Sequence, residues 1–112
     1  MKTLFTIIII LVSSISHAQE VKLDQNKINA IETLVKEKLL KFDYELDKVY
    51  VSPNVWSQYN VEGKETFTKL CAIYLRYKQN DKKNSPGLDL FDYNTGKKIA
   101  TYGSIRGFRI VQ

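Results

Sequence analysis

The sequence predicts an α+β fold, in which two to three helices pack on one face of a small, mostly antiparallel sheet of three to four strands. Apolar residues recur at helical spacing through much of the first two thirds of the chain. Strand-like stretches separated by glycine-containing turns fill the last third. The predicted order is helix, strand, helix, helix and three strands, and this order is typical of helices on one side of an antiparallel sheet.

Residues 1–18 have the features of a secretory signal peptide. A lysine precedes an apolar run from Leu4 to Val12, and small residues follow at Ser16 and Ala18. This order predicts cleavage between Ala18 and Gln19. The apolar run is too short for a spanning helix, which needs about 20 residues. We therefore expect a single α+β domain over residues 19–112, which is exported and either periplasmic or secreted.

The first predicted helix begins after Asp24 or Asn26, either of which can cap it. Its apolar residues recur with a helical period and extend to the residues that precede an acidic break at 43–47. They are Ile28, Ile31, Leu34, Val35, Leu39 and Phe42.

A short strand, Lys48–Val51, is expected next because its residues favour extended structure. Ser52 and Pro53 then predict the start of a short helix that reaches Tyr59. A longer helix is predicted from about Glu62 to Tyr77, with one broad apolar face.

The remaining residues predict strands. Leu88–Tyr93 and Lys97–Tyr102 flank the sequence Asn94-Thr95-Gly96, which indicates a hairpin with a positive φ at its glycine. After a turn between Gly103 and Gly107, residues 108–111 can form a last strand.

Several of these residues resemble a pattern found in small uncharacterised exported bacterial domains. In that pattern a helix ending near Ala72-Ile73-Tyr74 precedes a hairpin of the form D-x-x-[ST]-G-K-x-[IL]-A, here residues 92–100, and a closing strand begins at Gly107-Phe108. The resemblance covers about residues 48–111. It implies the fold and no activity, cofactor or binding residue.

The composition after cleavage excludes several kinds of chemistry. Removing 18 of the 112 residues leaves 94, and it removes His17, the only histidine. Histidine-dependent triads and the common zinc sites are then unavailable. Cys71 is the only cysteine and lies on an apolar helix face, which predicts a buried, unreactive thiol. We expect no catalytic residue, no metal and no cofactor.

Two further features have alternative interpretations. Asp89 and Asp92 are three apart on a predicted strand and so point to opposite faces, and Asp92 is expected to bind the hairpin loop rather than act in catalysis. Trp56 and Tyr59 either line a ligand cleft or anchor the core, and the core interpretation is favoured.

The C-terminal half of the chain is basic. Residues 61–112 hold ten Lys or Arg and five acidic residues. Lys97, Lys98, Arg106 and Arg109, called here the predicted basic patch, could bind an anionic partner such as lipid headgroups, polysaccharide or an acidic protein. The alternative is solubilising charge that protects an edge strand, and this simpler interpretation is favoured by the sequence alone.

These observations lead to an expected function without a specific ligand. We expect a non-enzymatic accessory or binding protein of a bacterial cell envelope, with an anionic envelope component or another exported protein as its partner. Nucleic acid is not expected, nor is a transmembrane segment after cleavage. Two alternatives remain open: a secreted hydrolase that uses carboxylates or a Ser-Lys dyad, and a structural or antagonist protein that binds another exported protein.

Overall fold

A computed structural model describes residues 22–79, 87–103 and 105–111, and the predicted signal peptide lies outside these ranges. Three helices and five strands follow one another along the described chain. They are α2 (Gln25–Lys36), β1 (Leu40–Asp43), β2 (Lys48–Val51), α3 (Pro53–Trp56), α4 (Val61–Gln79), β3 (Leu88–Asp92), β4 (Lys98–Gly103) and β5 (Gly107–Ile110).

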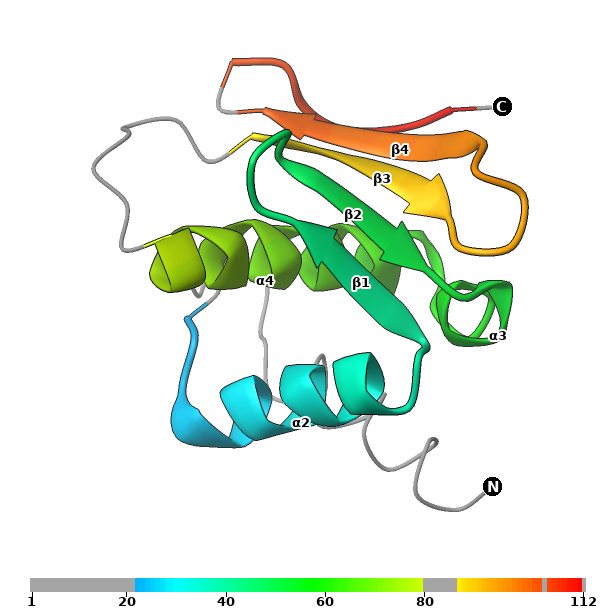
Figure 1. Ribbon diagram of the computed structural model, residues 1–112. Helices are drawn as coiled ribbons and strands as arrows, with labels where there is room; N and C mark the ends of the chain where they lie inside the picture. Colours follow the sequence, from blue (N-terminus) through cyan, green and yellow to red (C-terminus); the bar gives the residue numbers. More distant parts are fainter. Residues whose placement is uncertain (1–21, 80–86, 104, 112) are drawn as a thin grey trace.

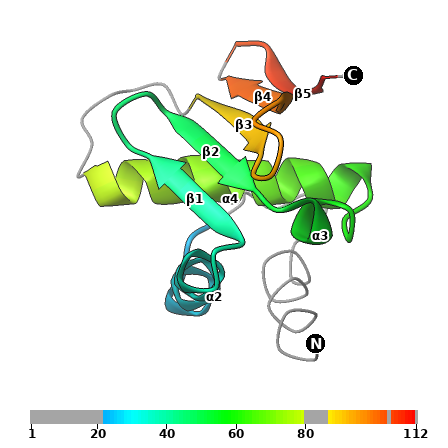
Figure 2. The same cartoon turned by 45° about the vertical axis from the view of Figure 1, so that its right-hand side comes forward.

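The five strands form one sheet in the order β1-β2-β3-β4-β5. Neighbouring strands are antiparallel except β2 and β3, which run parallel because α3 and α4 lie between them in the chain. Figure 1 shows α2 and α4 on one side of this sheet, and Figure 2 shows α2 end-on below β1. The α+β fold is therefore confirmed, with one strand more than the three to four predicted.

The additional strand is β1, and the prediction that the first helix continues to Phe42 is wrong. Helix α2 ends at Lys36 because Lys38 adopts a left-handed conformation with φ of 62°. The amide of Leu39 then donates to the carbonyl of Leu34 (2.9 Å), and the amide of Lys38 donates to that of Val35 (3.1 Å). These two bonds form a Schellman motif, which satisfies the last carbonyls of the helix and turns the chain into β1.

The starts of α2 and α3 follow the predicted capping signals, and α4 has a cap that was not predicted. The Asp24 side chain accepts from the amide of Lys27 at the start of α2 (2.9 Å). Ser52 caps α3 by accepting from the amide of Asn54, and Pro53 is in the first turn. The side chain of Asn60 accepts from the amide of Gly63 where α4 begins.

The core lies between the helices and the sheet. Its members come from every element except β5, and most are less than 5% exposed. The largest fully buried side chains are Phe67, Ile31, Leu34, Leu40, Leu70, Leu75, Leu90, Val49, Val51, Val55 and Thr68. The core residues of the strands lie on one face of the sheet. The residues between them in each strand therefore point to the opposite face.

No helix in the described ranges is both long enough and apolar enough to cross a bilayer.

Candidate functional site

The face of the sheet opposite the helices, called here the open face, is covered by no element of the described residues (Figures 1 and 2). Along β1, β2 and β3 its residues alternate with those that face the helices, because successive side chains of a strand point to opposite sides. In β4 a register shift opposite Leu90 and Phe91 interrupts this alternation, so that Lys98 is paired with Phe91. The pairing of the strands arranges the residues of the open face in two rows that run across the sheet.

The first row, called the aromatic row, consists of Lys41, Tyr50, Phe91 and Lys98, which are paired in that order from β1 to β4. The rings of Tyr50 and Phe91 are stacked, with centroids 5.3 Å apart and planes inclined by 29°. The Nζ atom of Lys41 lies 5.7 Å from the centroid of Tyr50. The Nζ atom of Lys48 lies 5.3 Å from the centroid of Phe91. Two ammonium groups therefore flank a stacked aromatic pair.

The second row, called the charged row, consists of Asp43, Lys48, Asp89, Thr101 and Arg109. Its two carboxylates already have partners. Asp43 accepts from the amides of Glu45 and Leu46, both at 3.1 Å. Asp89 lies 3.7 Å from the Nζ atom of Lys98, which belongs to the aromatic row. The charged row thus mixes both signs, whereas the aromatic row contains no carboxylate.

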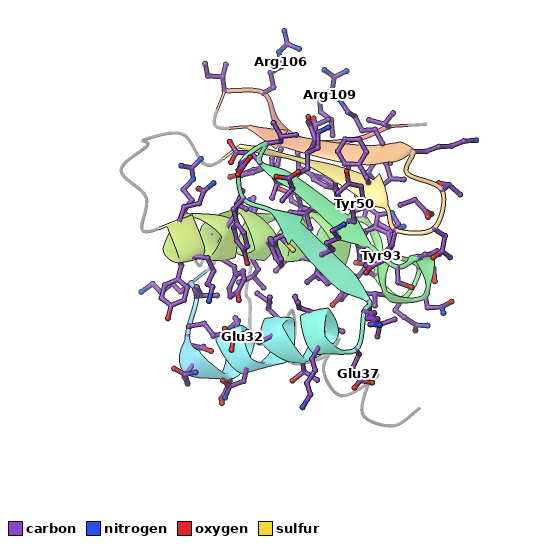
Figure 3. The ribbon with its side chains drawn as sticks, in the orientation of Figure 1. Glu32, Glu37, Tyr50, Tyr93, Arg106 and Arg109 are labelled. Atoms are coloured by element: carbon purple, nitrogen blue, oxygen red, sulfur yellow. The ribbon has the colours of Figure 1, made fainter. Side chains whose placement is uncertain are left out.

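The predicted basic patch is spread along β4 rather than gathered in one cluster. Lys97 lies just before β4, and Arg106 lies in the turn after it, so about 20 Å of strand separates them. All four side chains are exposed. Lys98 and Arg109 share the open face, and Figure 3 shows Arg106 and Arg109 pointing away from the helices.

Sequence reasoning missed four residues of the open face: Lys41, Lys48, Tyr50 and Phe91. Helical periodicity extends the predicted helix through Lys41, and this hides the alternation of Lys41 with Leu40 and Phe42. Tyr50 and Phe91 lie in strands that were predicted, but their contact depends on the parallel pairing of β2 with β3 across 36 intervening residues of chain. The only available signal was the period of two in residues 40–43 and 48–51.

Asp92 has the hairpin role predicted for it, and the structure adds a partner for Asp89. Asp89 faces the open side and pairs with Lys98. Oδ1 of Asp92 accepts from the amides of Asn94 (2.7 Å) and Thr95 (3.0 Å), and so closes the hairpin loop. The hairpin role of Asp92 is confirmed. Gly96 has the expected positive φ of 76°.

The buried candidates belong to the core. Cys71 is fully buried, and this burial raises the pKa of its thiol far above the ordinary value. The prediction of a buried thiol is confirmed. The ring of Tyr59 is stacked on Phe67, with centroids 5.3 Å apart, and Trp56 meets the same ring edge-on at 6.3 Å. These contacts agree with the core interpretation of Trp56 and Tyr59.

Within the described ranges, no three His, Cys, Asp or Glu side chains gather as a metal ion would require. The comparisons with known proteins add no relationship: no family model, no curated protein and no solved structure matches this chain.

Proposed function

We propose that this chain is an exported, non-enzymatic binding protein of a bacterial cell envelope, and that it binds an anionic partner on the open face of its sheet. The observation that carries the proposal is the arrangement of Lys41, Lys48, Lys98 and Arg109 on a sheet face that no described element covers. Arg106 and Lys97 extend the positive charge beyond the two ends of β4.

The sequence supports export and binding independently of this geometry. The signal-like residues 1–18 indicate export, and the predicted cleavage leaves no histidine for acid–base or metal chemistry near neutral pH. Residues 61–112 contain α4 as well as β3, β4 and β5, and four of their ten basic residues, Lys97, Lys98, Arg106 and Arg109, follow β3. A localised positive field attracts polyanions and accelerates their association, and salt weakens the attraction.

The experiment compares two variants of the protein beginning at Gln19 that have the same net charge. The open-face variant replaces the four cations of the open face with alanine (K41A, K48A, K98A, R109A). The control replaces four lysines that lie on or just before the helices (K22A, K36A, K69A, K78A). Binding to immobilised polygalacturonate and to anionic lipid vesicles is measured at low and moderate salt.

We expect the open-face variant to lose at least about tenfold in affinity, equivalent to about 1.4 kcal/mol, for whichever anionic probe binds. The control should lose less than about threefold, since its charges are on the other side of the sheet. Equal losses in the two variants would show that only net charge matters. Failure of every anionic probe to bind would refute the proposed function.

A further inference from the structure

We propose that the partner of the open face is a linear acidic polysaccharide, which lies across the strands along the aromatic row. This inference rests on the proposed function and deepens it, because it names the ligand class and the residues that hold it. Lys41 and Lys48 become the principal ligand-binding cations, although neither belongs to the predicted basic patch.

The distribution of charge between the two rows favours a chain over a surface. The aromatic row contains no carboxylate, whereas the charged row contains Asp43 and Asp89. A membrane or a globular acidic protein would cover both rows and would place its negative charges against these two carboxylates. A linear polyanion that follows the aromatic row can reach the ammonium group of Lys48, which lies over Phe91. It meets Asp89 only where that carboxylate is already paired with Lys98.

Two lysines of the open face, Lys41 of the aromatic row and Lys48 of the charged row, already lie over rings of the aromatic row before any ligand arrives. The ammonium groups of Lys41 and Lys48 lie over aromatic rings, where the ring quadrupole attracts them. A lysine side chain that is already ordered loses less conformational entropy when it pairs with an anion. The two ammonium groups therefore form a more effective anion site than two freely moving lysines would.

The rings favour a sugar chain over a single-stranded nucleic acid. Tyr50 and Phe91 use one ring face for each other, and lysines lie over the rings as well. Proteins that bind single-stranded nucleic acids stack the bases on the faces of aromatic rings. The ring faces of Tyr50 and Phe91 are already in contact with each other and with the two lysines. Ring edges carry partial positive charge, and the Tyr50 hydroxyl can donate a hydrogen bond. The carboxylates and hydroxyl groups of an acidic sugar can contact the ring edges and accept a hydrogen bond from the Tyr50 hydroxyl.

The dimensions of the row also suit a short stretch of polysaccharide. Lys41 and Lys98 are separated by three interstrand steps of about 4.8 Å, which gives about 14 Å. One interstrand step is close to the length of one sugar ring in an extended chain. Successive rings could therefore lie over successive strands, with the acidic groups near the lysines.

The test is a calorimetric titration of the protein beginning at Gln19 with polygalacturonate. K41M/K48M removes both ammonium groups and keeps most of the side-chain bulk. The control K36M/K78M makes the same change on the helices, where both lysines are exposed. We expect K41M/K48M to weaken binding by about 10- to 30-fold and the control by less than about threefold. Equal effects of the two double variants would overturn the proposal.

Phe91→Leu tests whether the ring that positions Lys48 contributes to binding. It removes this ring and leaves the number of lysines, and so the net charge, unchanged. We expect it to weaken polygalacturonate binding by about threefold or more, with the salt dependence of binding almost unchanged. Its unfolding midpoint is measured in parallel, so that binding is compared only under conditions where the variant is folded. Unaltered affinity in the folded variant would contradict the role of the rings.

Three other probes distinguish the ligand classes. They are vesicles of phosphatidylglycerol and phosphatidylethanolamine, oligothymidylate, and neutral amylose. Tighter binding to the vesicles or to oligothymidylate than to polygalacturonate would overturn the polysaccharide assignment and leave the proposed function standing. Equal binding of amylose and polygalacturonate would refute the role of charge. Binding of none of the anionic probes would refute both proposals.

Discussion

Lys38 occupies the position after the end of α2 where a Schellman motif usually has glycine. Its φ of 62° places a β-carbon in the left-handed region, which costs about 1–2 kcal/mol relative to glycine. Glycine in turn loses about 0.5–1 kcal/mol more backbone entropy on folding. Lys38→Gly should therefore raise the free energy of unfolding by about 0.5–1 kcal/mol, since the Lys38 side chain is exposed.

The matched control is Lys36→Gly, two residues earlier. Lys36 is the last residue of α2 and is also exposed. Both variants lose one lysine near the same helix end, so the loss of charge affects them similarly. At Lys36 the backbone is helical, and glycine should lower the free energy of unfolding by about 0.5–1 kcal/mol. Replacing lysine with glycine should therefore change the free energy of unfolding in opposite directions at the two positions.

Urea unfolding monitored by circular dichroism measures both variants, and thermal unfolding should give midpoint shifts of about 2–8 °C in opposite directions. Destabilisation by Lys38→Gly, or equal effects at the two positions, would refute the Schellman termination of α2. In that case the helix would continue toward Phe42, as the apolar periodicity alone suggests, and β1 would not form.

Other predictions concern the cap of α2, the buried thiol and the signal peptide. The hydrogen bond from the amide of Lys27 holds the pKa of Asp24 below its ordinary value of 3.8, so the unfolded chain binds more protons in acid. Asp24→Ala should therefore cost about 1 kcal/mol at pH 7 and progressively less as the pH falls below 3.8, and a penalty independent of pH in urea unfolding would contradict this account. The Cys71 thiol should react with a thiol reagent at least about a hundredfold more slowly in the native protein than in denaturant, and rapid native labelling would show that the thiol is accessible. Mass spectrometry of the exported protein should find Gln19 at its N-terminus, whereas a chain beginning at Met1 would disprove cleavage.

Local signals predicted most elements of the fold. Ser52-Pro53, Asn94-Thr95-Gly96 and the apolar face of the helix from 62 to 77 each depend on neighbouring residues, and each is found in the structure. The end of α2 was predicted wrongly because Lys38 replaces the glycine that signals a helix terminus. Leu39 and Phe42 fit both a helical and a strand period, so the apolar pattern could not identify β1.

The open face was beyond sequence reasoning for a different reason. Its rows come from the pairing of strands that lie far apart in the chain, as Tyr50 and Phe91 do. Sequence proximity placed Lys97, Lys98, Arg106 and Arg109 in one patch, but Lys97 and Arg106 lie beyond opposite ends of β4. Lys41 and Lys48, in contrast, belong to a half of the chain whose total charge is not positive, and no composition argument would select them.

The most direct test of the proposed binding surface is a titration of the isotope-labelled protein with polygalacturonate, followed by nuclear magnetic resonance of the backbone amides. We predict the largest shift changes at Lys41, Tyr50 and Phe91, on three adjacent strands. The amides of Ile31 and Leu34 in α2 should not change, because they lie in the core on the other side of the sheet. Changes concentrated on α2 and α4, or an unchanged sheet at saturating ligand, would contradict binding on the open face.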